Sequence, residues 1–166
     1  MEVFEVIIQT ERLQLRPFTL GDAEEYFKIV SSSQDIQEFV PFAYESTVDE
    51  MRQAISECYS VGNFKDDFYL IIEEMISHKI IGAIIAVRIF GKNLDLSILL
   101  GRDFRHKGFM FEAMNGFINY LKGTNYSYLS LCINNKNIAS QNLAHKLGAV
   151  KVGEIKGKYT QYFIDL

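Results

Sequence analysis

The sequence has few cysteines and no excess of basic residues, and each shortage excludes a class of protein. The two cysteines, Cys58 and Cys132, match no metal-binding or redox spacing. Each lies in an apolar-patterned segment, which favours buried free thiols. The formal net charge is −4. A nucleic-acid-binding surface is usually strongly basic, so we expect no nucleic-acid partner.

Signals for secretion or for a membrane are also lacking. Residues 1–15 carry Glu2 and no basic stretch, so they do not read as a secretory signal. The apolar run at residues 80–90 contains Arg88 and is too short to cross a bilayer. We therefore expect a cytoplasmic protein without a membrane partner.

The composition that is present is ordinary for one globular domain. The 166 residues are 48% apolar and 23% charged, and a chain of this length can bury a sizeable core without staples. No internal repeat, charge block or low-complexity linker divides it. The sequence therefore predicts a single domain over residues 1–166.

Hydrophobic spacing predicts an α+β (mixed α/β) fold of about seven strands and four helices. Strands are expected near residues 13–17, 68–74, 79–90, 94–100, 126–133, 149–156 and 159–164. Helices are expected after Asp22, after the capping box Thr47-Glu50, over residues 108–121, and over residues 137–147 before a capping Gly148.

The order of these elements predicts a mostly antiparallel sheet with one parallel pair. Three strands with short connections over residues 68–100 favour an antiparallel meander. The strand–helix–strand unit over residues 94–133 favours a right-handed parallel crossover within that sheet. A ligand is expected at the carboxyl ends of the parallel strands.

The connection between that strand and that helix has the features of a phosphate-binding loop. Arg105, His106 and Lys107 precede Gly108 at the start of the helix, and we expect their side chains to add charge to the loop. Free N–H groups and the helix dipole attract phosphate oxygens there, and glycine allows close backbone approach. Taken alone, the segment fits a solvated loop with an N-terminal glycine better than a binding loop, and its context decides.

Several segments, in order, resemble the GNAT N-acetyltransferases. The segment from Arg105 resembles their motif A, in which Arg or Gln, two intervening residues and Gly are followed, after one more residue, by Gly or Ala. Nearly the whole chain is similar to the subgroup of ribosomal-protein N-terminal and spermidine acetyltransferases. The matching segments are residues 10–17 (TERLQLRP), 81–84 (IGAI), 95–100 (DLSILL), 137–140 (NIAS) and 146–148 (KLG).

The resemblance implies a GNAT fold that binds acetyl-CoA as co-substrate and acetylates a primary amine. It implies that Ile98, Leu99 and Leu100 splay from the next parallel strand and pair with the pantetheine arm through their backbone. A backbone N–H near Leu99 and Leu100 would stabilise the oxyanion. The pyrophosphate would be held by the segment Arg105, His106, Lys107, Gly108, Phe109, Met110 and Phe111, and the pantetheine also by Asn137.

The chain departs from the family pattern at three positions. Met110 replaces a small residue, which is tolerable if its side chain enters the core. Ala149 replaces a common aromatic residue. Ala144 stands where many relatives carry the tyrosine that protonates the CoA thiolate. Ser140 could take over as acid, directly or through water, or it could cap the helix; both readings stay open.

A base is also needed, because a protonated amine cannot attack a thioester. Asp95 matches the family's acidic position and could act through water, or it could be a surface carboxylate. Glu73 and Glu74 are weaker candidates. The three histidines, at residues 78, 106 and 145, fall on unrelated segments, so we expect no metal.

The acceptor is left open. Phe39, Phe42 and Tyr44 could line an acceptor pocket or belong to the core. A homodimer is compatible with the sequence. Two hypotheses follow: an N-acetyltransferase, favoured by Arg105, Gly108 and the 137–140 motif, and an acyl-CoA-binding module of the same fold with weak or no catalysis, favoured by the missing tyrosine and by Met110.

Overall fold

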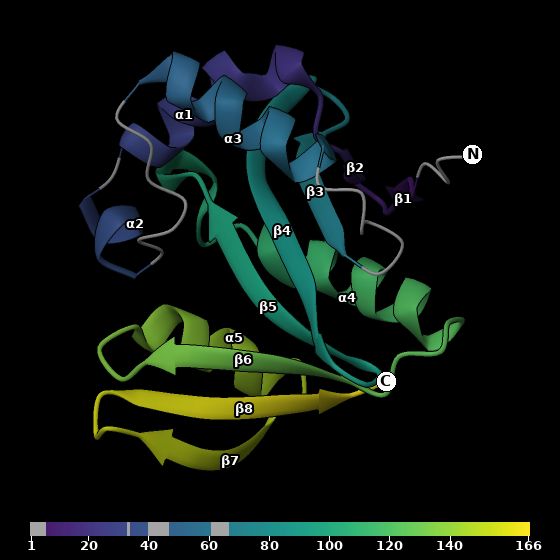
Figure 1. Ribbon diagram of the computed structural model, residues 1–166, viewed down its shortest axis with the longest axis vertical. Coiled ribbons are helices and arrows are strands. Elements are labelled where there is room, and N and C mark those ends of the chain that lie inside the picture. Colours follow the sequence, from purple (N-terminus) through teal and green to yellow (C-terminus); the bar gives the residue numbers. More distant parts are fainter. Residues whose placement is uncertain (1–5, 33, 40–46, 61–66) are drawn as a thin grey trace.

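The structure is a computed structural model, and it describes residues 6–32, 34–39, 47–60 and 67–166 (Figure 1). Its helices are α1 (Ala23–Ser31), α2 (Gln34–Phe39), α3 (Val48–Ser60), α4 (Phe109–Lys122) and α5 (Ile138–Lys146), with short 3-10 turns η1 (Leu20–Asp22) and η3 (Arg102–Phe104). Its strands are β1 (Ile8–Gln9), β2 (Leu13–Pro17), β3 (Phe68–Glu74), β4 (Lys79–Phe90), β5 (Asn93–Leu100), β6 (Tyr128–Asn134), β7 (Val150–Ile155) and β8 (Tyr159–Asp165).

The strands form one eight-stranded sheet in the order β1-β2-β3-β4-β5-β6-β8-β7. Every neighbouring pair is antiparallel except β5 and β6, which are parallel and joined through α4. The predicted fold class, the meander and the parallel crossover are therefore confirmed. Within the described ranges, no helix is long and apolar enough to cross a membrane.

Helices cover the two faces of the sheet unequally. The apolar stripe of α4 joins the inward side chains of β2, β5, β6 and β8 in the larger core cluster, which also contains Ala144 of α5. On the opposite face, α1 and α3 pack over β3 and β4 in a second cluster. Figure 1 shows that this second pair of helices covers only the upper strands, so the front of β6, β8 and β7 carries no helix in the described part of the chain.

Local signals in the sequence explain most helix ends. The Thr47 hydroxyl accepts from Glu50 N at 3.2 Å, as the capping box predicts. Gly148 follows α5 with φ +77°, a left-handed conformation that glycine adopts without a side-chain clash, so the predicted C-terminal cap is confirmed. Asp22 does stand before α1, but its carboxylate binds Arg16 and Thr19 and makes no cap hydrogen bond to that helix.

Two elements exceed the prediction. The two-residue strand β1 extends the sheet to eight strands, and it is too short to show an alternation. The six-residue α2 makes five helices, and it is too short to show a helical stripe. Phe39 ends α2, whereas Phe42 and Tyr44 lie outside the described residues.

Candidate active site

The parallel pair opens into a gap. β5 and β6 are paired only over Asn93↔Tyr128, Leu94↔Leu129 and Asp95↔Ser130. Beyond Asp95 the two strands separate, while each keeps its outer antiparallel neighbour to its end. The predicted splay is therefore confirmed. Because α4 and α5 follow β5 and β6, the N-termini of both helices lie at the wide end of the gap (Figure 1).

The backbone of β5 offers free groups to this gap. Gly101 N donates to the Ile81 carbonyl of β4 at 2.8 Å, and successive N–H groups of an extended strand point to opposite edges. The N–H groups of Leu100 and Ile98 therefore point toward the gap, whereas that of Leu99 points toward β4. The Leu99 side chain is buried in the second cluster, and those of Ile98 and Leu100 are partly buried against the larger one, so the backbone supplies the polar groups that these residues offer to a ligand.

The loop before α4 presents a row of unused donors. The intrahelical ladder begins when Glu112 N donates to the Gly108 carbonyl at 3.0 Å, and no backbone N–H from His106 to Phe111 has a backbone acceptor within the described residues. Both His106 (φ +62°) and Gly108 (φ +79°) are left-handed. Such a turn followed by helical residues forms a concave nest of N–H groups that binds anions.

The side chains of this loop divide by role. His106 and Lys107 are exposed, as is Phe111, whereas Phe109 and Met110 are buried in the larger cluster. The expectation that Met110 points into the core is confirmed. The loop therefore tolerates a large residue there because the side chain leaves the ligand face.

Arg105 differs from the expectation that it adds free charge to the loop. Its Nε donates to the Leu100 carbonyl at 3.2 Å, and its Nη1 pairs with the Asp35 carboxylate of α2. The guanidinium therefore joins α2 to the end of β5. This contact arises from α2, which the sequence analysis did not predict.

The start of α5 resolves the two readings of Ser140 in part. The cap of this helix is Asn137, whose Oδ1 accepts from Ser140 N at 3.1 Å. Ser140 is the third residue of the helix and not its cap, so that reading is wrong. Ala144, at the family's tyrosine position, is fully buried in the larger cluster. Roles for Asn137 and Ser140 toward a ligand stay predictions.

Asp95 lies where the parallel pairing ends. It is half-buried, and its carboxylate accepts a hydrogen bond from the Ser130 hydroxyl, which in turn accepts from Gln161 Nε2 of β8 at 2.6 Å. Burial raises the pKa of Asp95 above its ordinary value, and the Ser130 hydrogen bond offsets part of that rise. A raised pKa makes a carboxylate a stronger base.

Neither the pairing of Ser130 with Asp95 nor that of Gln161 with Ser130 was predicted from the sequence. Local spacing predicted the strand at residues 126–133, but the pairing of β6 with β8 is long-range. Asp95, Ser130 and Gln161 come together only through the registers in which β6 pairs with β5 and with β8.

Cys132 follows on the same side of β6. It is a free cysteine, as predicted, but it is exposed and not buried, because the described helices leave this face of β6 uncovered. Partial desolvation of its thiol and the charge of Asp95 both raise the Cys132 pKa. The side chain of Cys58 lies outside the described residues.

The weaker base candidates lie elsewhere. Glu73 pairs with Arg16 at 3.0 Å, and Glu74 accepts from the Ser77 hydroxyl, at the β2–β3–β4 end of the sheet. Within the described residues, no group of three or more His, Cys, Asp or Glu side chains could hold a metal ion.

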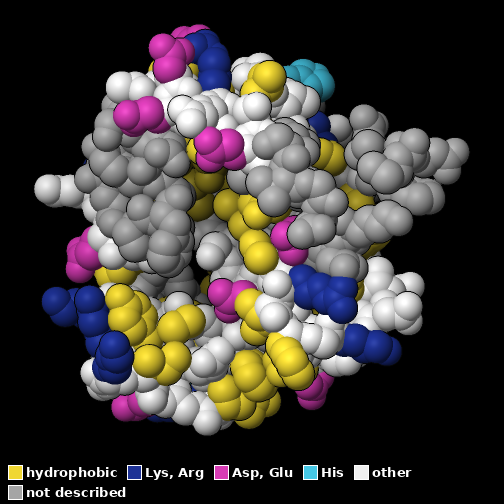
Figure 2. Space-filling view, in the orientation of Figure 1, with side chains coloured by type: hydrophobic (Ala, Val, Ile, Leu, Met, Phe, Trp, Pro, Cys, Tyr) yellow, Lys and Arg dark blue, Asp and Glu magenta, His cyan; other side chains and the backbone are white. Residues whose placement is uncertain are grey.

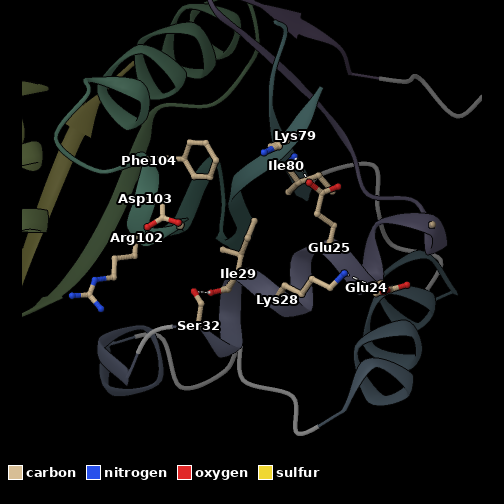
Figure 3. A pocket seen from close by; sticks show the side chains of 12 residues that line it. Glu24, Glu25, Lys28, Ile29, Ser32, Lys79, Ile80, Arg102, Asp103 and Phe104 are labelled. Carbon is tan, nitrogen blue, oxygen red and sulfur yellow. Dashed lines mark hydrogen bonds and ion pairs between the residues drawn. The ribbon is translucent and has the colours of Figure 1, made fainter. Parts of the chain in front are cut away.

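Two grooves flank the predicted site without containing it. The larger, of about 890 Å³, lies between α1, the start of β4 and η3 (Figure 3). Its charged groups partly pair with each other or with the backbone: Lys28 with Glu24 at 3.1 Å, and Glu25 with Ile80 N at 3.0 Å. The smaller, of about 260 Å³, adjoins the end of β6 at Asn134 and Lys136.

The front of β6, β8 and β7 carries apolar side chains, which Figure 2 shows spread over the lower part of the molecule in the orientation of Figure 1.

The splayed pair, the open loop and the two helix N-termini define the fold of a GNAT acyltransferase. A family model described as acetyltransferase (GNAT) domain matches residues 12–150. The chain belongs to the GNAT acetyltransferase family.

Solved structures share this fold at low sequence identity. RimL, a ribosomal L7/L12 α-N-protein acetyltransferase in complex with coenzyme A through a cysteine disulfide, is 15% identical with a TM-score of 0.85, over 97% of this chain and 98% of that one. The Salmonella typhimurium acetyl transferase that modifies the N-terminal serine of L7/L12 is 14% identical with a TM-score of 0.82, over 97% and 99%.

A third structure is the Microcin C7 self immunity acetyltransferase MccE in complex with acetyl-CoA and AMP. It is 18% identical with a TM-score of 0.77, over 94% of this chain and 93% of that one. No curated protein matches the sequence. The family is therefore established, and these structures show the shared fold.

Proposed function

We propose that this chain is an N-acetyltransferase that transfers the acetyl group of acetyl-CoA to a primary amine by direct attack. One observation carries the proposal: the gap between β5 and β6 ends at a loop whose N–H groups from His106 to Phe111 have no backbone acceptor in the described part of the chain. That combination suits a ligand with an anionic head and an amide-bearing arm.

Each part of acetyl-CoA has a proposed partner. The diphosphate binds the amides from His106 to Phe111. The pantetheine amides pair with the free edge of β5 at Ile98 and Leu100, and with the Asn137 side-chain NH₂, because its Oδ1 already accepts from Ser140 N. The acetyl carbonyl takes the N–H of Ile98, further along the gap toward Asp95, and this donor stabilises the oxyanion of the tetrahedral intermediate.

Asp95 is the proposed base. Its raised pKa suits the removal of a proton from the incoming ammonium group through a water molecule. The free amine then attacks the thioester carbon, and the intermediate expels the CoA thiolate. Ser140 is the proposed donor of the proton to that thiolate; it is partly buried in the first turn of α5.

The acceptor class is proposed as a primary amine: a protein N-terminal α-amine, a polyamine or a small-molecule amine. Two of the solved relatives act on the N-terminus of a ribosomal protein. This similarity supports placing protein N-terminal peptides first in a screen.

A second candidate function is an acyl-CoA-binding module with weak or no catalysis. The buried Ala144 favours it, because no hydroxyl stands at the usual acid position. The discriminating experiment measures thiol release from acetyl-CoA with N-terminal peptides, polyamines and small amines, beside calorimetric titration with CoA. Release with any amine supports the enzyme, whereas CoA binding without release across the panel supports the module.

A further inference from the structure

The connection between β1 and β2 is bound to the first turn of α4, about 100 residues further along the chain. Thr10 Oγ1 donates to Glu112 Oε1 at 2.6 Å, and Arg12 N donates to the same oxygen at 2.7 Å. Arg12 Nε donates to Glu112 Oε2 at 2.6 Å. One carboxylate thus receives three donors beside the phosphate loop.

The rest of the Arg12 guanidinium reaches the loop itself. Its Nη1 donates to the Lys107 carbonyl at 3.1 Å. Its Cζ lies 4.4 Å from the centre of the Phe109 ring. A Cβ added to Gly108 would lie 3.5 Å from its Nη2. Arg12 therefore contacts the loop on both sides of its glycine.

The Lys107 contact constrains the direction of a loop donor. In a planar trans peptide, the carbonyl of one residue and the N–H of the next point in opposite directions. Because Arg12 holds the Lys107 carbonyl, the N–H of Gly108 is directed away from Arg12 and outward from the β1–β2 connection. The donor is thus oriented before any ligand arrives, which lowers the entropy lost on binding.

The Glu112 contact has an electrostatic consequence. A carboxylate in the first turn of a helix would repel an anion bound at that N-terminus. Burial by itself would raise the Glu112 pKa, but the hydrogen bonds from Thr10 and Arg12 outweigh it and lower that pKa, so the group stays ionised. The positive charge of Arg12 compensates this negative charge where the diphosphate is proposed to bind.

We propose that Arg12 is a positioning residue for the diphosphate of acyl-CoA, acting by orienting the Gly108 N–H and by neutralising Glu112. The inference rests on the proposed function. The competing explanation is that Arg12 only joins the β1–β2 connection to α4 and contributes stability alone.

The two explanations differ in their effect on ligands with and without a diphosphate. We would measure Kd for CoA and for pantetheine by calorimetry, and KM and kcat for acetyl-CoA and acetyl-pantetheine by thiol release. Arg12→Ala should raise Kd and KM for the CoA forms roughly tenfold, the effect of losing a hydrogen bond that serves a charged group. The pantetheine values and kcat should stay unchanged.

Arg16→Ala is the matched control. Arg16 lies on β2 and pairs with Asp22 at 2.9 Å and Glu73 at 3.0 Å, so its loss removes a comparable ion-pair group away from the loop. It should lower thermal stability without changing the ratio of CoA to pantetheine affinity. If Arg12→Ala does not fold, the ratio of CoA to pantetheine affinity is measured in Arg12→Lys instead. Lysine keeps the charge but lacks the forked guanidinium that reaches Glu112 and Lys107 together.

An unchanged affinity ratio in a folded Arg12 variant overturns the inference, as does a wild-type protein that binds CoA no more tightly than pantetheine. A wild type that binds CoA but acetylates no amine contradicts the enzyme proposal alone. The ratio of dissociation constants still decides the role of Arg12 in that case.

Discussion

Asp95 of β5 and Ser130 of β6 are the last residues that the parallel strands pair, and the Ser130 hydroxyl donates to the Asp95 carboxylate. This polar contact between side chains of the two strands therefore marks the closed end of the gap. Asp95 therefore lies at the end of the free edge along which acyl-CoA is proposed to bind.

The first prediction concerns Asp95 as a base. Asp95→Asn removes the proton acceptor, so kcat should fall by roughly a hundredfold, within the usual contribution of a general base. The loss should be greatest below neutral pH, where the amine most needs a proton acceptor. The pH profile of kcat/KM with one amine measures this effect.

Ser130→Ala provides the control for the first prediction. The Ser130 hydrogen bond lowers the Asp95 pKa, so its removal should move the acid limb of the kcat/KM profile to higher pH. The value of kcat/KM above that limb should stay unchanged. An acid limb that does not move in Ser130→Ala and persists in Asp95→Asn would rule out Asp95 as the titrating base.

The second prediction is that Asp95 costs stability when it is ionised. Its folded-state pKa is raised, so the folded protein holds this proton more tightly than the unfolded chain. The stability that protonated Asp95 contributes is fully present below the pKa of Asp95 in the unfolded chain. It is lost as the pH rises through the raised pKa of the folded state. Asp95→Asn should therefore be more stable than wild type near neutral pH, by an amount that shrinks on acidification. Denaturant unfolding at several pH values measures the difference, and a difference that does not vary with pH would contradict the assignment.

The contrast between predicted and observed elements follows from the range of the interactions. The strands at residues 68–74 and 79–90 match β3 and β4, because alternation and apolar runs are local properties. The gap was predicted through family resemblance, and the crossover through a topological rule. These signals need no knowledge of side-chain partners.

The features that were missed or wrong depend on distant partners. Arg105 was expected to add charge to the loop, but its guanidinium pairs with the Asp35 carboxylate on an unpredicted helix. Cys132 looked buried from its strand pattern, yet no described helix covers its face. The contacts of Arg12 with Glu112 join residues 100 positions apart. A single sequence carries no local signal for such pairs.

The third prediction tests the phosphate loop. Gly108→Val should abolish CoA binding, because the added side chain would block backbone approach to the diphosphate and valine is strained at φ +79°. Gly148→Val is the matched control, since Gly148 has φ +77° and lies at the end of α5. Both variants should lose similar stability in thermal unfolding. Only Gly108→Val should lose the calorimetric signal with CoA, and normal binding by that variant would contradict the loop assignment.

The fourth prediction concerns Ser140. Because Asn137 provides the cap of α5, Ser140→Ala should leave stability and CoA affinity almost unchanged. It should lower kcat by roughly ten- to a thousandfold if Ser140 protonates the thiolate. Asn137→Ala should behave in the opposite way, with about 1 kcal/mol less stability from the lost cap and weaker CoA binding. Weaker CoA binding with unchanged kcat in Ser140→Ala would make Ser140 a pantetheine contact.

The fifth prediction uses Cys132 as a reporter of the gap. Its side chain is exposed on β6 two residues beyond Ser130, and partial desolvation of the thiol together with the charge of Asp95 raises its pKa. Since the thiolate is the reactive form, alkylation by iodoacetamide should be slow at neutral pH and accelerate as pH rises. Asp95→Asn should accelerate it at a given pH by removing the negative charge that raises the pKa. Saturating CoA should protect the thiol, because the pantetheine arm would fill the gap beside it. A Cys58→Ser background ensures that the label is on Cys132, and mass spectrometry measures the rate of alkylation. Equal rates with and without CoA, in a protein that calorimetry shows to bind CoA, would place the pantetheine arm away from β6.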